Sequence, residues 1–196
     1  MTRPCDNHAV GTIIIRQSPV TGKRAAELRY LVCTRATFPA AGALPALHLD
    51  SYGDAQAAAL AAVGPTGLRA STPQPLASGW RDNRCHRVPG RRVGHQWQIW
   101  QVIARGDIDS RYRAEHGADW RSRSDLQKMA HRTALYAGGL ISPDQFAEEP
   151  GVDPAWIYWL HRLQLIELSP AELGLTSALA RGVLDAEGWL TPAEPT

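Results

Sequence analysis

Cysteine is scarce in this chain of 196 residues. Its three cysteines, Cys5, Cys33 and Cys85, are an odd number at wide spacing, and such a pattern does not build a disulfide framework. The first residues, MTRPCDNH, contain no apolar stretch of the signal-peptide type. The sequence therefore predicts a cytoplasmic protein with reduced thiols.

Long apolar runs and an excess of one charge are also missing. The longest apolar stretch, Val10–Ile15, is far shorter than the roughly 20 residues that a membrane span needs. The 21 Lys and Arg residues nearly balance the 19 Asp and Glu residues, and the basic ones gather only between residues 81 and 92. We therefore expect a protein that binds neither membranes nor nucleic acids.

The sequence patterns of several common sites are absent as well. The chain has no phosphate-binding loop, no G-x-S-x-G nucleophile turn and no dinucleotide fingerprint. No C-x-x-C or H-x-x-x-H spacing supports a zinc site, although candidate ligands exist in Cys5, His8, Cys85, His86 and His95. We expect no metal and no cofactor.

Apolar residues make up 44% of the chain, which is enough for one globular domain with a sizeable core. Strands are predicted over Ala9–Arg16, Leu28–Arg35, Leu76–Trp80 and Gln96–Ile103, the first two as a hairpin. Helices are predicted over Asp54–Val63, Ser124–Tyr136, Ala155–Leu165 and Ser169–Gly182, with a short one opening at Ser142. The stretch Phe38–Pro45 is expected to be irregular. This order predicts an α+β fold, a mixed sheet sandwiched by helices, with a helical C-terminal extension.

One segment resembles a known motif. The stretch ALHLDSYGDAQAAALAAVGPTGL, residues 46–68, has the length and layout of the Nudix box, in which a loop, a helix and a second loop carry metal-binding glutamates. Gly67-Leu68 matches the end of that motif. Ala61 replaces the glutamate of its Arg-Glu pair, and Gly64-Pro65 replaces its two following glutamates.

The flanking sequence is similar to a Nudix subfamily of actinobacteria. The similar stretches are CDNHAVGTII at 5–14, GWRDNRCHRVPG at 79–90, HQWQIW at 95–100 and the segment 131–166. The resemblance implies a Nudix-like domain over residues 1–130 and a helical extension over 131–196 packed on it. It also implies a ligand cavity beside the box, walled by the first strands, the box loop and residues 80–100.

Nudix hydrolases cleave pyrophosphates with Mg²⁺ or Mn²⁺ ions that clustered carboxylates hold. Residues 55–68 contain no Asp or Glu, so the predicted helix has lost these ligands. The resemblance therefore implies the fold and not this activity. An alternative keeps the hydrolysis with displaced metal ligands, Asp50 and Asp54.

Several polar and aromatic residues could serve this cavity. His48, Asp50 and Tyr52 alternate, so an extended loop would place all three on one face. With His95 they are the candidates for acid–base catalysis, because an imidazole exchanges protons near neutral pH. The candidates for ligand binding are Cys5, Asn7, Arg81, Asn83, Arg84 and Trp97. Both sets also have a purely structural interpretation as polar loops at the start of a strand or helix.

The tryptophans mark two surfaces. In the strand 96–103, Trp97 and Ile99 share one face, whereas Trp100 lies on the opposite one. The helical spacing of Trp156 and Trp159 predicts a core stripe or a dimer contact. A homodimer is therefore one expectation.

These residues lead to one main hypothesis. A Nudix-fold protein without metal ligands would use its cavity for acid–base chemistry, an isomerisation or cyclisation of a small organic molecule in specialised metabolism. The first alternative is a non-catalytic protein that binds a small or nucleotide-like ligand. The second is the hydrolase with displaced metal ligands.

Overall fold

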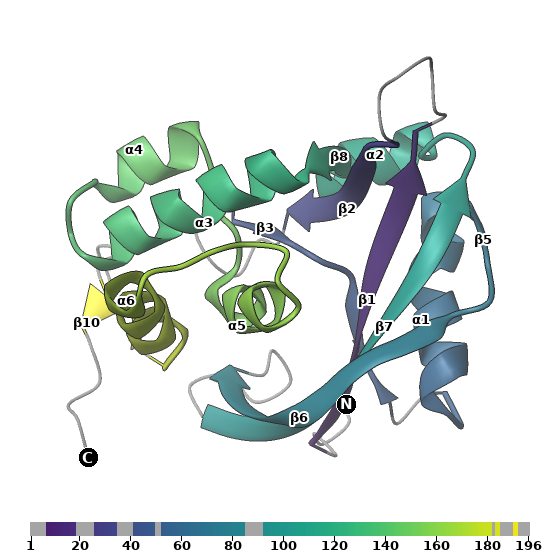
Figure 1. Cartoon of the computed structure of the whole chain (residues 1–196), viewed down its shortest axis with the longest axis horizontal. Coiled ribbons are helices and arrows are strands. Elements are labelled where there is room, and N and C mark those ends of the chain that lie inside the picture. The colour runs from purple at the N-terminus through teal and green to yellow at the C-terminus, as the bar shows by residue number, and fades with distance from the viewer. Residues whose placement is uncertain are drawn as a thin grey trace.

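A mixed sheet divides the molecule into two unequal sides (Figure 1). The computed structural model describes residues 7–18, 26–34, 41–49, 52–84, 92–181, 183–184 and 190–191. The helices are α1 (Ala55–Val63), α2 (Ser110–His116), α3 (Arg123–Ala137), α4 (Pro143–Glu148), α5 (Pro154–Arg162) and α6 (Pro170–Arg181). Helix α1 covers one face of the sheet, and α3, α5 and α6 gather on the other side. This is the α+β arrangement that the sequence predicted.

The sheet has eight strands. They are β1 (His8–Gln17), β2 (Leu28–Thr34), β3 (Gly42–Ala43), β4 (Ala46–His48), β5 (Arg69–Ala70), β6 (Gln74–Arg84), β7 (Arg92–Arg105) and β8 (Asp119–Ser122). The main order is β3-β2-β1-β7-β5, while β4 pairs with β1, β6 with β7, and β8 with β2. Strands β1 and β7 run parallel from His8 opposite Gln96 to Ile15 opposite Ile103. The other strand pairs of the described chain are antiparallel, including the short pair β9 (Val183–Leu184) and β10 (Leu190–Thr191).

Small side chains let α1 lie close to the sheet. The carboxylate of Asp54 accepts a hydrogen bond from the Ala57 N–H at 2.7 Å and begins the helix, as the sequence predicted. Ala58 and Ala59 are completely buried, and Ala62 is buried as well. The Thr12 hydroxyl of β1 donates to the Ala59 carbonyl across 3.4 Å. A strand side chain reaches the helix backbone because methyl groups leave room for it.

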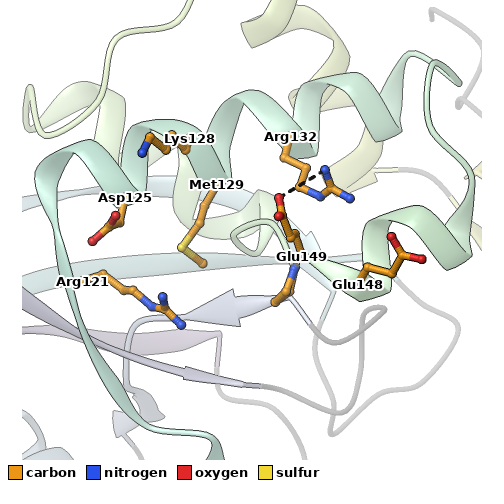
Figure 2. Close-up of a pocket in the computed structure, with 8 residues that line it drawn as sticks. Arg121, Asp125, Lys128, Met129, Arg132, Glu148 and Glu149 are labelled. Atoms are coloured by element: carbon orange, nitrogen blue, oxygen red, sulfur yellow. Dashed lines mark ion pairs between the residues drawn. The ribbon is translucent and has the colours of Figure 1, made fainter.

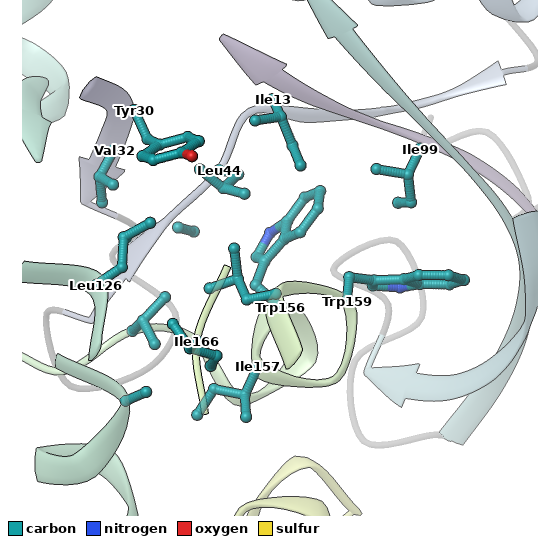
Figure 3. Close-up of a cluster of buried hydrophobic side chains, with 14 of the residues drawn as sticks. Ile13, Tyr30, Val32, Leu44, Ile99, Leu126, Trp156, Ile157, Trp159 and Ile166 are labelled. Atoms are coloured by element: carbon teal, nitrogen blue, oxygen red, sulfur yellow. The ribbon is translucent and has the colours of Figure 1, made fainter. Parts of the chain in front are cut away.

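Large aromatic side chains fill the other face (Figure 3). Trp156 and Trp159 of α5 are fully buried, so the predicted stripe is core. Trp97 and Ile99 belong to the same cluster, whereas Trp100 packs on the α1 side, as their alternation predicted. A Cβ at Gly11 would overlap the Trp156 ring, so glycine at this position makes room for the indole.

Hydrogen-bonded caps fix the helices on this side. Ser122 and Asp125 form a reciprocal capping box at the start of α3, and Ser142 and Gln145 form another at α4. The Asp153 carboxylate caps α5. The division that we expect between residues 130 and 131 lies inside α3, which is one continuous helix.

Several short elements differ from the expectation. The stretch expected to be irregular contains β3, which pairs with Cys33 and Thr34 of β2. Helix α2 and the strands β4, β5 and β8 have no counterpart in the prediction, and the pair β9–β10 lies in the extension that was expected to be helical. Helix α2 buries none of its residues, so its sequence carries no apolar period. Within the described part of the chain, none of the helices combines the length and the apolar character needed to cross a membrane.

Candidate functional site

The strand register gathers several predicted residues on the sheet face that α5 covers. Ala9 of β1 lies opposite His48 of β4 on one side and opposite Trp97 of β7 on the other. On the far side of β7, Arg81 of β6 lies opposite His95. Residues directly opposite each other in neighbouring strands share a face, with Cβ atoms about 5 Å apart in antiparallel pairs. His48, His95 and Arg81 therefore share one face of the sheet, with His95 and Arg81 two residues along from the row of His48, Ala9 and Trp97.

The two histidines form the centre of this site. The ring centroids of His48 and His95 lie 5.5 Å apart at an angle of 69°. His95 is 1% exposed, while His48 is half-buried at the end of β4. The methyl side chain of Ala9 leaves space for the His48 ring to approach β7. One imidazole is thus shielded from water and the other reaches toward it, an arrangement suited to moving a proton.

Tryptophans extend the histidine pair into the core. The His95 and Trp97 rings lie 6.2 Å apart, and the Trp97 and Trp156 rings lie 5.6 Å apart with an edge-to-face tilt. Such edge contacts hold aromatic rings in fixed orientations. The buried end of the site is therefore rigid.

Arg81 connects the histidines to α5. Its guanidinium carbon lies 4.4 Å from the centroid of the Tyr158 ring, a cation–π contact. Arg162 donates to the Tyr158 hydroxyl at 3.1 Å and lies over the Trp159 ring at 5.5 Å. Gly79 of β6 leaves the space that Arg162 and Trp159 occupy. Two guanidinium groups and a phenol are thus held near one another, a set that can bind a carboxylate or phosphate.

The remaining predicted residues have other positions. The backbone carbonyl of Asn7 accepts from the Gln96 N–H at 2.7 Å at the start of β1, and the role of its side chain in ligand binding stays a prediction. Cys5 and Asp50 lie outside the described residues. Asn83 and Arg84 continue β6, paired with Val93 and Arg92, but their side chains are outside the described part.

Tyr52 is not on the face of His48, so the expected alternation is wrong at this point. The Tyr52 N–H donates to the Leu49 carbonyl at 2.9 Å. The extended backbone ends at His48. Tyr52 then packs beside Val10, Ala55 and Trp100 on the α1 side of the sheet.

A cleft of about 280 Å³ that sequence reasoning missed opens at the end of α1. Its described lining residues are Cys33, Thr34, Ala43, Leu44, Pro45, Ala46, Leu47, Ala61, Ala62, Pro65, Tyr112 and His116. Two of these, Ala61 and Pro65, are box positions where the Nudix motif has glutamates. No short-range pattern joins the polar pair Cys33 and Tyr112, which are 79 residues apart in the sequence.

A second cleft, of about 350 Å³, lies along α3 (Figure 2). Charged side chains dominate it, namely Arg121, Asp125, Lys128, Arg132, Glu148 and Glu149. Arg132 pairs with Glu149 at 3.7 Å and also donates to the Gln145 carbonyl. The Asp125 carboxylate is occupied by the Ser122 cap, which holds the pKa of Asp125 below its ordinary range.

The chemistry of α1 does not fit the metal that the box implies. Mg²⁺ and Mn²⁺ require oxygen ligands, and a methyl group at Ala61 and a ring at Pro65 supply none. In the described ranges, no group of three or more His, Cys, Asp or Glu side chains could hold a metal ion. Of the nearby described carboxylates, that of Asp54 caps the far end of the helix, and that of Asp109, beside Thr66 and Gly67, accepts the N–H groups that begin α2.

Comparisons with known proteins give structural likenesses alone. No family model and no curated protein sequence matches the chain. A Nudix hydrolase from M. smegmatis is 16% identical over 61% of this chain and 72% of its own, with a TM-score of 0.40. An Ap4A hydrolase from C. elegans is 17% identical over 62% and 83%, with a TM-score of 0.42. A Nudix domain from Shewanella oneidensis, complexed with ADP ribose, is 12% identical over 61% and 75%, also at 0.42.

Proposed function

We propose that this protein carries out metal-independent acid–base chemistry, an isomerisation or a cyclisation, on a small organic anion. The observation that carries the proposal is the pair of imidazoles, His48 and His95, brought to 5.5 Å from two different strands. Arg81 lies opposite His95 on the next strand, with its guanidinium over the Tyr158 ring. Groups for proton exchange and for anion binding thus come from the same face of the sheet.

In this proposal the half-buried His48 contacts the substrate and the buried His95 supports it. A neutral imidazole removes a proton from a carbon atom, and the resulting imidazolium returns a proton to a different atom of the substrate. No net proton is gained or lost in such an isomerisation. Arg81 binds the carboxylate or phosphate, and Trp97 forms an apolar wall.

The hydrolase alternative has less support. Its proposed ligand Asp54 accepts the hydrogen bond that begins α1, so that carboxylate already has a structural task. Asp50 lies outside the described residues. Ala61, Ala62 and Pro65 leave the last turn of the helix region without any oxygen ligand in their side chains.

A non-catalytic binding protein is the second candidate function. The arrangement of Arg81, Tyr158 and Arg162 favours it, because these groups can recognise an anion without any proton transfer. The two candidates share one site and differ in whether the imidazoles exchange protons with the ligand.

Proton exchange can be measured without knowing the complete reaction. The EDTA-treated protein is incubated in D₂O with enolisable oxo acids, including levulinate and 2-oxoglutarate, and carbon-bound deuterium is followed by NMR. We expect catalysed exchange that EDTA does not affect. His48→Gln and His95→Gln should each slow it by roughly 10²–10⁴-fold, the usual contribution of a general acid or base. His131→Gln, an exposed histidine on α3, is the matched control.

The outcomes separate the candidates. Exchange that disappears with EDTA and returns with Mg²⁺ would support the displaced-ligand hydrolase. Oxo acids that bind through Arg81 without exchange in any variant would support the binding protein. Exchange that persists in both histidine variants would exclude the imidazole pair as the catalytic groups.

A further inference from the structure

We propose that the cleft at the end of α1 binds a small, uncharged and largely apolar molecule that carries one carbonyl group. This site is separate from His48 and His95 and does not depend on the function proposed for them. The residues that line the cleft come from β2, the β3–β4 segment, the end of α1 with the following Pro65, and helix α2. Figure 1 labels these strands and helices.

The walls of the cleft are mostly apolar. Eight of the lining residues are Ala, Leu or Pro, contributed by residues 43–47 and by Ala61, Ala62 and Pro65. Their side chains offer no hydrogen bond and no charge. A ligand that fills the cleft gains the free energy of burying apolar surface, which requires an apolar body.

The polar groups lie together on β2 and α2. The Cys33 sulfur and the Tyr112 hydroxyl are 3.5 Å apart, and the Tyr112 and His116 ring centroids are 4.4 Å apart. The Thr34 hydroxyl donates to the His116 carbonyl at 2.9 Å, which ties the end of α2 to β2. Contacts with Cys33 and His116 therefore fix the position of the Tyr112 phenol.

This phenol is a donor at neutral pH. Burial, assisted by the hydrogen bond with Cys33, raises the pKa of Tyr112 above its ordinary range. The hydroxyl keeps its proton, so it can donate to a carbonyl oxygen. A carbonyl oxygen on the ligand would accept a hydrogen bond from the Tyr112 hydroxyl in this cleft.

The described lining disfavours anionic ligands. None of the described lining residues is Asp, Glu, Lys or Arg, and His116 is the one described side chain there that can take up a proton. A carboxylate or phosphate bound here would lose its hydration with no described Lys or Arg to replace it, at high cost. The cleft in Figure 2 is the opposite case, since six of its eight lining residues are charged.

The volume sets an upper limit on the ligand. A dry apolar cavity of about 150 Å³ is enough to hold a benzene molecule. The 280 Å³ of this cleft can therefore hold a benzene ring with a short carbonyl substituent. Larger cofactors and nucleotides would extend beyond it.

Two fluorinated probes of matched shape test the proposal. They are 4-fluoroacetophenone, a neutral ketone, and 4-fluorobenzoate, its anionic counterpart, each titrated with the full chain and followed by ¹⁹F NMR. We expect the ketone to bind at least tenfold more tightly than the benzoate. Tyr112→Phe should weaken the ketone by roughly two- to tenfold, the effect of losing one hydrogen bond.

Variants of α1 locate the binding. Ala61→Leu places a larger side chain at the wall of the cleft and should weaken the ketone at least tenfold. Ala57→Leu makes the same change on the exposed side of the same helix and should leave affinity within twofold. A cooperative thermal unfolding transition shows that each variant is folded. The affinity of Tyr112→Phe for the ketone, measured by ¹⁹F NMR, gives a second test that leaves α1 unchanged.

Three results would overturn the proposal. The first is equal affinity for the ketone and the benzoate, and the second is equal ketone binding in Ala61→Leu and Ala57→Leu. The third is no detectable ketone binding to the unmodified chain. Loss of ketone binding in a folded Ala61→Leu, together with its retention in Ala57→Leu, supports the assigned site.

Discussion

The two faces of the sheet are packed by opposite means. On one face, α1 presents methyl groups and approaches until Thr12 of β1 reaches the Ala59 carbonyl. On the other, α5 stands off the strands and fills the space with Trp156 and Trp159. The first face depends on the absence of side-chain volume and the second on its presence. Enlargement should therefore damage the α1 face, and truncation the α5 face.

Truncation of Trp156 should give the largest loss. Its ring fills the space above Gly11 and contacts the Trp97 ring. Trp156→Ala should lower the free energy of unfolding by about 3–5 kcal/mol, the usual cost of deleting a buried tryptophan. Urea denaturation measures it, with the exposed Trp80→Ala as control. Equal losses in both variants would mean that the α5 face does not depend on aromatic volume.

Enlargement on the α1 face should give the next largest effect. Ala58 is 0% exposed, so Ala58→Leu must push the helix away from the sheet. The expected loss is roughly 1–3 kcal/mol of unfolding free energy. Ala57→Leu, on the exposed side, should be nearly neutral or slightly stabilising because leucine is a good helix former. If both variants unfold at the same urea concentration, α1 is not closely packed.

Removal of the α1 cap should have a smaller effect. Asp54→Ala deletes the acceptor for the Ala57 N–H and should cost about 1 kcal/mol. Asp54→Asn keeps an acceptor and should recover most of that loss. An Asn variant as unstable as the Ala variant would show that the charge, and not the hydrogen bond, stabilises the start of the helix.

The caps on the α5 side should produce a small pH dependence. Hydrogen bonds from Ser122 lower the pKa of Asp125, and those from Ser169 and His131 lower the pKa of Glu172. A lowered pKa in the folded state gives stability that is present above the ordinary carboxyl pKa and is lost as the pH falls through the lowered value. Between pH 6 and pH 3, the melting temperature of Asp125→Asn should fall less than that of the unmodified chain. Equal slopes would show that the Asp125 cap does not contribute to acid unfolding.

Much of the fold could be predicted from local sequence patterns. The β-branched residues of β1 and β2, the Asp54 cap and the spacing of Trp156 and Trp159 all act within a few residues. The elements that escaped prediction have no such pattern. The strand β8 is recognised only by its pairing with β2, where Tyr30 lies opposite Arg121.

The candidate site could be predicted in part. Sequence reasoning singled out His48, His95 and Arg81, but their proximity depends on the register of β4, β1, β7 and β6, which no local pattern specifies. Tyr52 was misplaced because alternation holds only while the backbone stays extended. The pair of Cys33 and Tyr112 joins distant elements, and neither residue belongs to a recognisable motif.

The parallel pairing of β1 with β7 determines when the centre of the sheet can form during synthesis. Strand β1 leaves the ribosome well before its long partner, which begins at Arg92. Until then, the apolar residues Ile13 and Ile14 lack the neighbour that covers them. Non-local pairing of this kind slows folding and prolongs the exposure of aggregation-prone apolar segments. We expect nascent chains that stop before β7 to aggregate or to require chaperones, and chains that extend through α5 to become protease-resistant.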